Sequence, residues 1–401
     1  MTQLPDCRDL ACRHLGRAPP PPPPVPRPPP RPAVEASWAE SRRLAGAQAA
    51  ASPVRVVFER SAGLLRQFQG SAQDAAEAVF RAVCGTPGPS APDTFWLDSA
   101  DTERSRFSFL GGRGGPMWRR FTCELAEGQQ PAGASHRPGP VAARITEVDA
   151  RGAASSHVEP SGVLGFLERQ AGRYRVENGP LEELPFEFWG GLVGYLGYEL
   201  KAECGGEALH RARDPDACWF FVDRFVAMDH QQGDVYTVAL HPAVDDSGQE
   251  AAAAVSWTRD ALARASAAIA AGADLPVAAR DAASLQQAVR DLPTSSRFQL
   301  VRGHGRYLDD VAECRRALFE GESYEICLTN TIERRAGPVA DPWPLYRVLR
   351  AANPAPYAAW LDFSGCVGPG RGPVLCCSSP ERFLRCSSGG WLEARCASPL
   401  H

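Results

Sequence analysis

The segment TFWLDSADTERSRFSFLGGRGGPMWRRFTCEL, residues 94–125, contains three short runs rich in aromatic and apolar residues. The runs are Thr94–Asp98, Arg106–Leu110 and Arg120–Leu125, and a glycine cluster at 111–115 separates the second from the third. Short runs of this kind, joined by glycine turns, are typical of neighbouring antiparallel β-strands. The segment therefore predicts an antiparallel sheet.

Similar patterns extend through the rest of the chain. Further strands are predicted at Trp219–Asp229, Val235–Leu240, Tyr324–Ile332, Tyr357–Asp362, Val374–Cys377, Phe383–Cys386 and Trp391–Ala394, with a hairpin at 230–234. Helices are predicted at Ala72–Val83, Ser256–Ala271 and Tyr307–Phe319, and a polar loop at 129–162. Because the strands do not alternate regularly with helices, the pattern favours an α+β fold with antiparallel sheets over a doubly wound fold.

The charge balance excludes some classes of protein. Lys and Arg total 43 against 47 Asp and Glu, a formal net charge of −4, whereas an electrostatic nucleic-acid binder would carry a basic face or tail. The longest apolar stretch, Phe188–Leu200, is broken by glycines and far shorter than the roughly 20 residues that span a bilayer. We therefore expect neither a nucleic-acid partner nor a membrane span.

Lysine and cysteine usage limit the chemistry. Lys201 is the single lysine of the sequence, so a mechanism that needs a lysine nucleophile has one candidate. The 13 cysteines are an odd number, are irregularly spaced and form no C-x-x-C pair, which predicts free thiols. The eight histidines form no H-E-x-x-H motif, and Gly368–Gly372 is predicted to be a surface loop, not a phosphate site.

The ends of the globular regions are marked by composition. Residues 1–50 predict a disordered, proline-rich head with eleven prolines between Pro19 and Pro32. Because its first residues carry arginines, this head can be interpreted as a transit peptide, as a linker or as an artefact of the gene model. Low-complexity residues 273–298 predict a connector between a first region at 51–272 and a second at 299–395.

Four blocks of sequence occur in an order that resembles the chorismate-utilising enzymes. They are Trp189–Glu199, Gly321–Asn330, Asn353–Leu361 and Cys376–Leu384. Within that family the chain most resembles the plant-type component I of aminodeoxychorismate synthase, through residues 94–99, 106–112 and 215–221. Anthranilate synthase component I, the alternative, usually has a Glu-Ser pair in place of Asp98-Ser99 and a methionine in place of Ala358.

The resemblance implies a fold and a reaction. The fold has two antiparallel sheets packed together with helices outside, in which 51–272 is the region like the N-terminal part of anthranilate synthase component I and 299–395 begins the chorismate-binding region. The reaction replaces the 4-hydroxyl of chorismate with an amino group, using ammonia from a glutamine amidotransferase domain or subunit, and requires Mg²⁺. A plant-type member is expected in the plastid, with the cytoplasm as the alternative.

The same resemblance assigns site residues. Hydroxide is a poor leaving group and needs an acid to protonate it, and the family's acid/base glutamate corresponds to Glu381. From the local sequence alone, a solvated turn or an ion pair with Arg382 stays open for Glu381. A tryptophan-like pocket corresponds to Ser99, Arg106, Phe107, Ser108, Phe109, Pro356, Tyr357 and Ala358. For Ser99 and Tyr357, hydrogen bonding within the sheet is the alternative.

The chain departs from the family after Ala394. A Lys-Pro-Ile-Lys-Gly-Thr block is expected there, but the tail at 396–401 is divergent, and Ser398 stands where the nucleophilic lysine is expected. The magnesium-binding glutamates of the family are also absent, so no metal ligand is assigned and the fold is expected to be incomplete at the C-terminus. We therefore expect a truncated, inactive fragment. A catalytically dead paralogue that binds a tryptophan-like ligand or the amidotransferase, and an unstable product, are the alternatives.

Overall fold

The computed structural model describes residues 51–85, 93–102, 105–126, 141–178, 181–206, 212–245, 247–272, 298–334, 342–368, 371–387 and 390–395. All of them lie in one compact unit, Ala51–His401. The predicted head at 1–50, the tail at 396–401 and all but the last residue of the connector at 273–298 lie outside the described residues. The boundaries between the predicted regions stay predictions.

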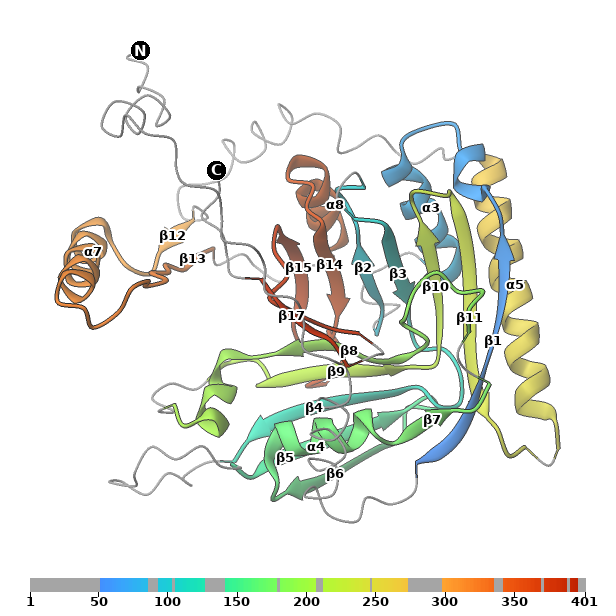
Figure 1. Ribbon diagram of the computed structural model, residues 1–401, viewed down its shortest axis with the longest axis horizontal. Helices are drawn as coiled ribbons and strands as arrows, with labels where there is room; N and C mark the ends of the chain where they lie inside the picture. The colour runs from blue at the N-terminus through green and yellow to red at the C-terminus, as the bar shows by residue number, and fades with distance from the viewer. Residues whose placement is uncertain are drawn as a thin grey trace, which may run out of the picture. The chain divides into compact units, whose positions relative to one another are not determined.

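The larger of two main sheets has eight strands in the order β15-β14-β2-β3-β10-β11-β1-β7 (Figure 1). Their bounds are β1 Ser52–Ser61, β2 Phe95–Asp98, β3 Phe107–Gly111, β7 Tyr174–Val176, β10 Arg224–Asp229, β11 Asp234–Pro242, β14 Tyr357–Asp362 and β15 Val374–Ser379. Neighbouring strands are antiparallel except β1 and β7, which are parallel. The predicted antiparallel sheet is therefore confirmed, with one parallel pair at its edge.

The smaller main sheet has five antiparallel strands in the order β6-β5-β4-β9-β8. Their bounds are β4 Arg119–Leu125, β5 Ala143–Asp149, β6 Ala154–Glu159, β8 Gly191–Leu196 and β9 Ala217–Val222. Two further antiparallel pairs are short. Strand β12 Gln299–Leu300 pairs with β13 Ile332–Glu333, and β16 Leu384–Cys386 pairs with β17 Leu392–Ala394.

The helices of the described residues are mostly of ordinary length. They are α3 Ala72–Cys84, α4 Gly162–Ala171, α5 Gln249–Ala271, α7 His304–Phe319 and α8 Trp343–Ala352, with 3-10 turns η1 Leu64–Gln67 and η2 Tyr198–Cys204. Helix α3 begins with a capping box, in which the Ser71 side chain accepts the Asp74 N–H and the Asp74 carboxylate accepts the Ser71 N–H. No helix in the described part of the chain is both long and apolar enough to cross a bilayer.

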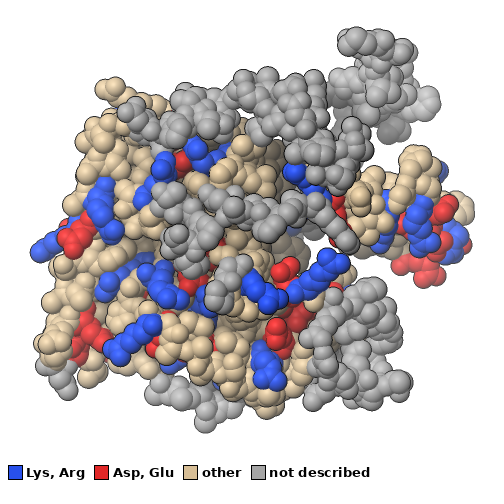
Figure 2. All heavy atoms as spheres, turned by 180° about the vertical axis from the view of Figure 1, so that it is seen from behind, with Lys and Arg blue, Asp and Glu red and all other residues tan. Residues whose placement is uncertain are grey.

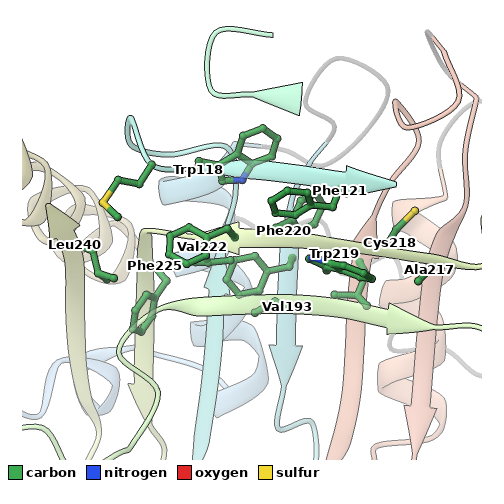
Figure 3. Close-up of a cluster of buried hydrophobic side chains, with 14 of the residues drawn as sticks. Trp118, Phe121, Val193, Ala217, Cys218, Trp219, Phe220, Val222, Phe225 and Leu240 are labelled. Carbon is green, nitrogen blue, oxygen red and sulfur yellow. The ribbon is translucent and has the colours of Figure 1, made fainter. Parts of the chain in front are cut away.

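Two hydrophobic cores hold these layers together. The first contains side chains of both main sheets, such as Phe220 of the smaller sheet and Phe225 of the larger (Figure 3). Trp118, which directly precedes β4, packs against Phe220 with ring centroids 5.8 Å apart. The second lies where the larger sheet meets α3, α5 and α8, and stacks Phe80 against Trp96 at 5.1 Å. Burying one such side chain contributes about 1.5–3 kcal/mol. The predicted fold, two packed sheets with helices outside, is confirmed.

The loop predicted at 129–162 is wrong for its second half. Residues 127–140 lie outside the described part, but Ala143–Asp149 and Ala154–Glu159 are strands β5 and β6. In β5 the apolar positions Ala143 and Ile145 are fully buried and Arg144 between them is exposed. This alternation is the signature of a half-buried strand, and the Gly, Pro and Ala content around it obscures the signal.

The continuous strand predicted at Trp219–Asp229 is also wrong, because the chain leaves one sheet and enters the other at Asp223. Strand β9 ends at Val222 in the smaller sheet and β10 starts at Arg224 in the larger. The buried Asp223 carboxylate accepts the N–H groups of Gly115 at 2.9 Å and Met117 at 2.8 Å. These bonds fix the crossing point, which an unbroken apolar run does not reveal.

The strand predicted at Tyr324–Ile332 is wrong as well. Only Ile332–Glu333 is a strand, and Tyr324 is 95% exposed. Helix α7, which precedes this segment, forms as predicted, but none of its residues is buried. Its Arg316 forms ion pairs with Glu313 and Glu320, one helical turn away on either side. The remaining predicted strands and helices, and the hairpin at 230–234, are confirmed with small shifts at their ends, except that the helix predicted at Ser256–Ala271 begins seven residues earlier, at Gln249.

Charged side chains of both signs are intermixed on the face opposite to the one in Figure 1, as Figure 2 shows. Among the described residues, the exposed side chains of Arg395 and Glu393 form an ion pair at 2.8 Å. Exposed pairs of this kind contribute little to stability, and the mixture agrees with the nearly balanced composition of the sequence.

Candidate functional site

The segments assigned to a tryptophan-like pocket meet at one end of the larger sheet. Strand β2 lies between β14 and β3, so Ala358 at the start of β14 pairs with Asp98 at the end of β2. On the other side of β2, Leu97 pairs with Phe109 of β3. Residues more than 200 positions apart in the sequence therefore become neighbours there.

Hydrogen bonds within the sheet use the polar atoms of Ser99. Its N–H donates to the Ser108 hydroxyl at 2.9 Å, and its own hydroxyl donates to the Phe107 carbonyl oxygen. The Ser108 hydroxyl lies 2.8 Å from Nε2 of His230. Burial lowers the pKa of His230, which favours the neutral ring at this contact. The alternative predicted for Ser99, hydrogen bonding within the sheet, matches this geometry.

A buried carboxylate holds the Arg106 side chain. The guanidinium of Arg106 donates through Nη2 to the Asp229 carboxylate at 2.7 Å and through Nε at 3.1 Å. This hydrogen bonding raises the pKa of Arg106. The same guanidinium lies 4.6 Å from the centre of the Phe107 ring. Asp229 and His230 belong to the β10–β11 hairpin. The sequence predicts this hairpin but gives it no role in the site, whereas in the structure its side chains hold those of Arg106 and Ser108 at the start of β3.

An aromatic cluster lies on the face of β3 that points toward the first core. Phe107 and Phe109 are half-buried, and their rings pack edge-on against Phe186 at 5.6 and 5.4 Å. Phe109 also contacts Phe188 at 5.4 Å. Aromatic pairs favour edge-on arrangements of this kind. Phe186 and Phe188 are absent from the sequence-based site, although they immediately precede the Trp189–Glu199 block.

The β14 end of the site combines an exposed and a buried residue. Tyr357 is 36% exposed and Ala358 only 2%. The Pro356 carbonyl oxygen accepts the Ser105 hydroxyl at 2.8 Å, which ties β14 to the turn before β3. The small side chain at Ala358 fits its buried position opposite Asp98.

Asp98, which the sequence marks only as a subfamily feature, is the centre of a buried polar cluster. Its carboxylate accepts Nε of Arg350 at 2.7 Å and the Tyr346 hydroxyl at 3.2 Å. The Arg350 guanidinium lies 4.5 Å from the Trp96 ring centre. Both partners lie on α8, a helix that the sequence reasoning missed. The spacing of Trp343, Tyr346 and Arg350 along one helical face is the signal that could have found it.

Glu381 lies at the same end of the larger sheet as the pocket segments. It follows β15, whose last residue Ser379 pairs with Tyr357. The carboxylate is exposed, and the Glu381 N–H donates to the Ser379 hydroxyl at 3.5 Å. The neighbouring Arg382 forms its ion pair with Glu393 at 2.7 Å. The geometry is that of the solvated turn rather than of an ion pair between adjacent residues.

Comparison with known proteins decides the family. A model of the chorismate binding enzyme family matches residues 129–397, about two thirds of the chain. The chain belongs to this family. It is 35% identical over 350 residues to a probable chloroplastic aminodeoxychorismate synthase of Oryza sativa subsp. japonica, covering 85% of the chain and 37% of the relative. It is 38% identical over 312 residues to the chloroplastic aminodeoxychorismate synthase of Arabidopsis thaliana, covering 76% and 31%.

A bacterial relative of the chain shows a similar degree of identity. The aminodeoxychorismate synthase of Streptomyces pristinaespiralis is 36% identical over 326 residues, covering 80% of the chain and 38% of the relative. The chain thus spans about a third of the length of the curated relatives it matches. The predicted resemblance to aminodeoxychorismate synthase is confirmed. An anthranilate synthase alpha subunit of Arabidopsis thaliana matches over 79 residues only, so the alternative is not favoured.

The described residues of this member of the chorismate binding enzyme family contain no group of three or more His, Cys, Asp or Glu side chains that could hold a metal ion. Mg²⁺ usually keeps several waters and can be held by one or two carboxylates together with its substrate. No metal ligand is therefore assigned among these residues.

The single lysine of the chain, Lys201, lies in the turn η2, within the region that the family model matches. Its ammonium lies 4.6 Å from the centre of the Tyr198 ring, and Tyr198 is 80% exposed. A cation–π contact of this kind at an exposed site contributes about 0.5–1 kcal/mol.

Proposed function

We propose that the protein catalyses, as part of an aminodeoxychorismate synthase, the amination of chorismate to 4-amino-4-deoxychorismate for para-aminobenzoate and folate synthesis. The observation that carries the proposal is the extent of similarity. Relatives named aminodeoxychorismate synthase align with 75–85% of the chain at 35–38% identity in two plants and two Streptomyces species. The anthranilate synthase matches cover less of it.

The proposal includes a substrate, a partner and a compartment. Chorismate is the substrate, and a glutamine amidotransferase domain or subunit supplies the ammonia. Mg²⁺ is the cofactor proposed for the intact enzyme, and no ligand for it is assigned among the described residues. The plastid is the proposed compartment because both plant relatives are named chloroplastic, with the cytoplasm as the alternative.

Glu381 is the proposed general acid and base. The 4-hydroxyl leaves as water only if a group protonates it, and a carboxylic acid can do so and then accept a proton from the incoming amine. Two features support the assignment. The carboxylate is exposed, so a substrate can reach it, and it follows the strand that pairs with Tyr357. Glu381 lies two residues beyond the end of this strand.

A tryptophan-like ligand is proposed for the sheet end formed by β2, β3 and β14. The half-buried rings of Phe107 and Phe109 offer an apolar surface for an indole ring. The partly exposed guanidinium of Arg106 offers a charge for a carboxylate, although Asp229 already occupies part of it. Tyr357, also partly exposed, completes the rim. This pocket would regulate the amination without taking part in it.

Genetic complementation tests the proposed reaction. The native gene product is expressed in a bacterium that lacks its own component I of aminodeoxychorismate synthase but keeps the amidotransferase. We expect growth without para-aminobenzoate, and no growth when the same gene is placed in a strain that lacks anthranilate synthase and needs tryptophan. Growth only of the strain that needs tryptophan would show that the gene product is an anthranilate synthase and would overturn the proposal.

A further inference from the structure

Two cysteines from different sheets meet beside the first core. Cys218 lies in β9 of the smaller sheet and is fully buried (Figure 3). It pairs with Thr122 of β4 on one side and with Tyr195 of β8 on the other. Side chains directly opposite each other in antiparallel strands lie on the same face. Thr122, Cys218 and Tyr195 therefore form a row across the smaller sheet.

Cys366 approaches this row from the loop that connects β14 and β15 of the larger sheet. Phe363 of the same loop contacts the ring of Tyr195, which lies opposite Cys218, with centroids 5.7 Å apart. The thiols of Cys366 and Cys218 accordingly shift each other's pKa. The sequence gives no hint of this pair, because 148 positions separate the two cysteines and neither belongs to a spaced motif.

Two further contacts hold the loop against the smaller sheet. The Phe363 ring stacks on Phe220 of β9, with ring centroids 4.4 Å apart. Arg120 of β4 donates through Nη2 to the Gly365 carbonyl oxygen at 3.0 Å. Inside the loop, the Cys366 N–H donates to the Phe363 carbonyl oxygen at 2.9 Å. The loop is thus fixed against the smaller sheet directly before Cys366.

The two thiols differ in the way that a redox pair requires. The interaction with Cys218 and the charge of Arg120 lower the pKa of the Cys366 thiol. Burial raises the pKa of Cys218, and the interaction with Cys366 raises it further. Cys366 is also partly exposed, whereas Cys218 is not. A thiol that ionises readily and reaches solvent reacts first with an oxidant.

We propose that Cys218 and Cys366 form a reversible disulfide that joins the β14–β15 loop to β9. The oxidant is a low-molecular-weight disulfide such as oxidised glutathione. The Cys366 thiolate attacks one sulfur of the oxidant, forms a mixed disulfide and releases one glutathione thiolate. Cys218 then gives its proton to that thiolate and attacks the Cys366 sulfur, which releases the second glutathione. The protein loses two electrons and two protons, and two glutathione thiols are formed.

The bond would act on the strands that carry the candidate site. Tyr357 is the first residue of β14 and Ser379 is the last of β15, and the two pair at the end of the sheet that carries the candidate site. The loop with Cys366 joins the two strands at their opposite ends. Fixing the loop to the smaller sheet restrains both strands. The inference does not depend on the proposed reaction, because the thiols can be examined without any substrate.

Peptide mapping tests the proposal. The purified protein is incubated with oxidised glutathione, its remaining thiols are alkylated in urea, and the tryptic peptides are identified by mass spectrometry. Cleavage after arginine gives peptides 214–224 and 351–371, in which Cys218 and Cys366 are the only cysteines. We expect these two peptides to be joined, and to separate after reduction with dithiothreitol.

Three variants complete the test. In Cys366→Ser, Cys218 should be recovered alkylated, and in Cys218→Ser, Cys366 should carry one glutathione. Cys204→Ser, which removes an exposed thiol in η2, should leave the cross-link intact. Recovery of alkylated Cys218 and Cys366 from the wild-type protein, under conditions that add glutathione to Cys204, would overturn the proposal. A cross-link of Cys366 to any other cysteine would overturn it too.

Discussion

Arg350 and Asp98 form a buried ion pair, with the guanidinium Nε 2.7 Å from a carboxylate oxygen and both side chains at most 4% exposed. The pair joins α8 to the end of β2, directly before Ser99. Tyr346 donates to the same carboxylate at 3.2 Å. Because the candidate pocket begins at this strand end, the pair fixes the position of residues that would contact a ligand.

Removing Arg350 should destabilise the protein strongly. Arg350→Met leaves the Asp98 carboxylate buried without its charged partner, which typically costs about 3–5 kcal/mol of unfolding free energy. Urea denaturation followed by tryptophan fluorescence measures the difference. Arg302→Met, which removes an exposed arginine paired with Asp310, is the control and should cost under about 1 kcal/mol. Equal losses in the two variants would show that the buried pair has no special role.

Replacing Glu381 should reduce turnover without unfolding the protein. In the native gene product, Glu381→Gln removes the proposed acid and base, and such groups contribute about 100-fold or more to the rate. The exposed position of Glu381 predicts an unchanged melting temperature. Steady-state production of aminodeoxychorismate gives the rate. Glu124→Gln, an exposed glutamate of β4, is the matched control and should keep full activity. A Glu381→Gln variant as active as wild type would remove Glu381 from the mechanism.

Stability should fall in mild acid through His230. Burial lowers the pKa of His230 below its ordinary value of 6.5. The unfolded chain therefore binds a proton at a higher pH than the folded chain, so this contribution to stability is complete above pH 6.5 and is lost as the pH falls toward the folded pKa. Denaturation at pH 7.5 and 5.5 should show a smaller loss for His230→Asn than for wild type. His157→Asn, an exposed control, should lose as much as wild type.

The aromatic cluster should control binding of a tryptophan-like ligand. Phe107→Ala removes a ring that packs against Phe186 and Phe109, and is expected to weaken tryptophan binding about tenfold, the equivalent of ~1.4 kcal/mol. Isothermal titration calorimetry gives the dissociation constants. Phe383→Ala, an exposed phenylalanine beyond β15, serves as the control. Absence of any heat with wild-type protein would remove the pocket from the account.

The 401 residues expressed alone should form no aminodeoxychorismate from chorismate, ammonium and magnesium. The family's nucleophilic lysine has no counterpart in the sequence, and the single lysine, Lys201, is held over the Tyr198 ring. Chromatography of the reaction mixture detects the product. Measurable product from these residues would show that the missing lysine is not needed.

Local patterns predicted the parts of the fold that they control. The run Tyr357–Asp362 alternates between faces and forms β14 within those same bounds. Such patterns do not reveal which strands pair when they lie far apart in the sequence. The run 219–229 looks continuous, but Asp223 divides it because Gly115 and Met117, more than 100 positions earlier, bind its carboxylate. The run 324–332 has the composition of a strand but finds a strand partner only at its last residue.

The candidate site shows the same limit. The resemblance to a family placed the pocket segments, and the sheet brings Ala358 beside Asp98 as neighbours. The groups that support them were missed, since Arg350 lies 252 positions from its partner Asp98 and His230 lies 122 positions from Ser108. Contacts of that kind depend on the complete fold and leave no trace in the spacing of residues.

The product formed from chorismate decides between the proposed reaction and its alternative. The native gene product is incubated with chorismate, magnesium and either ammonium or glutamine with an amidotransferase, and the products are separated and identified by mass spectrometry. We expect 4-amino-4-deoxychorismate. Anthranilate as the product, or chorismate recovered unchanged, would disprove the proposed amination.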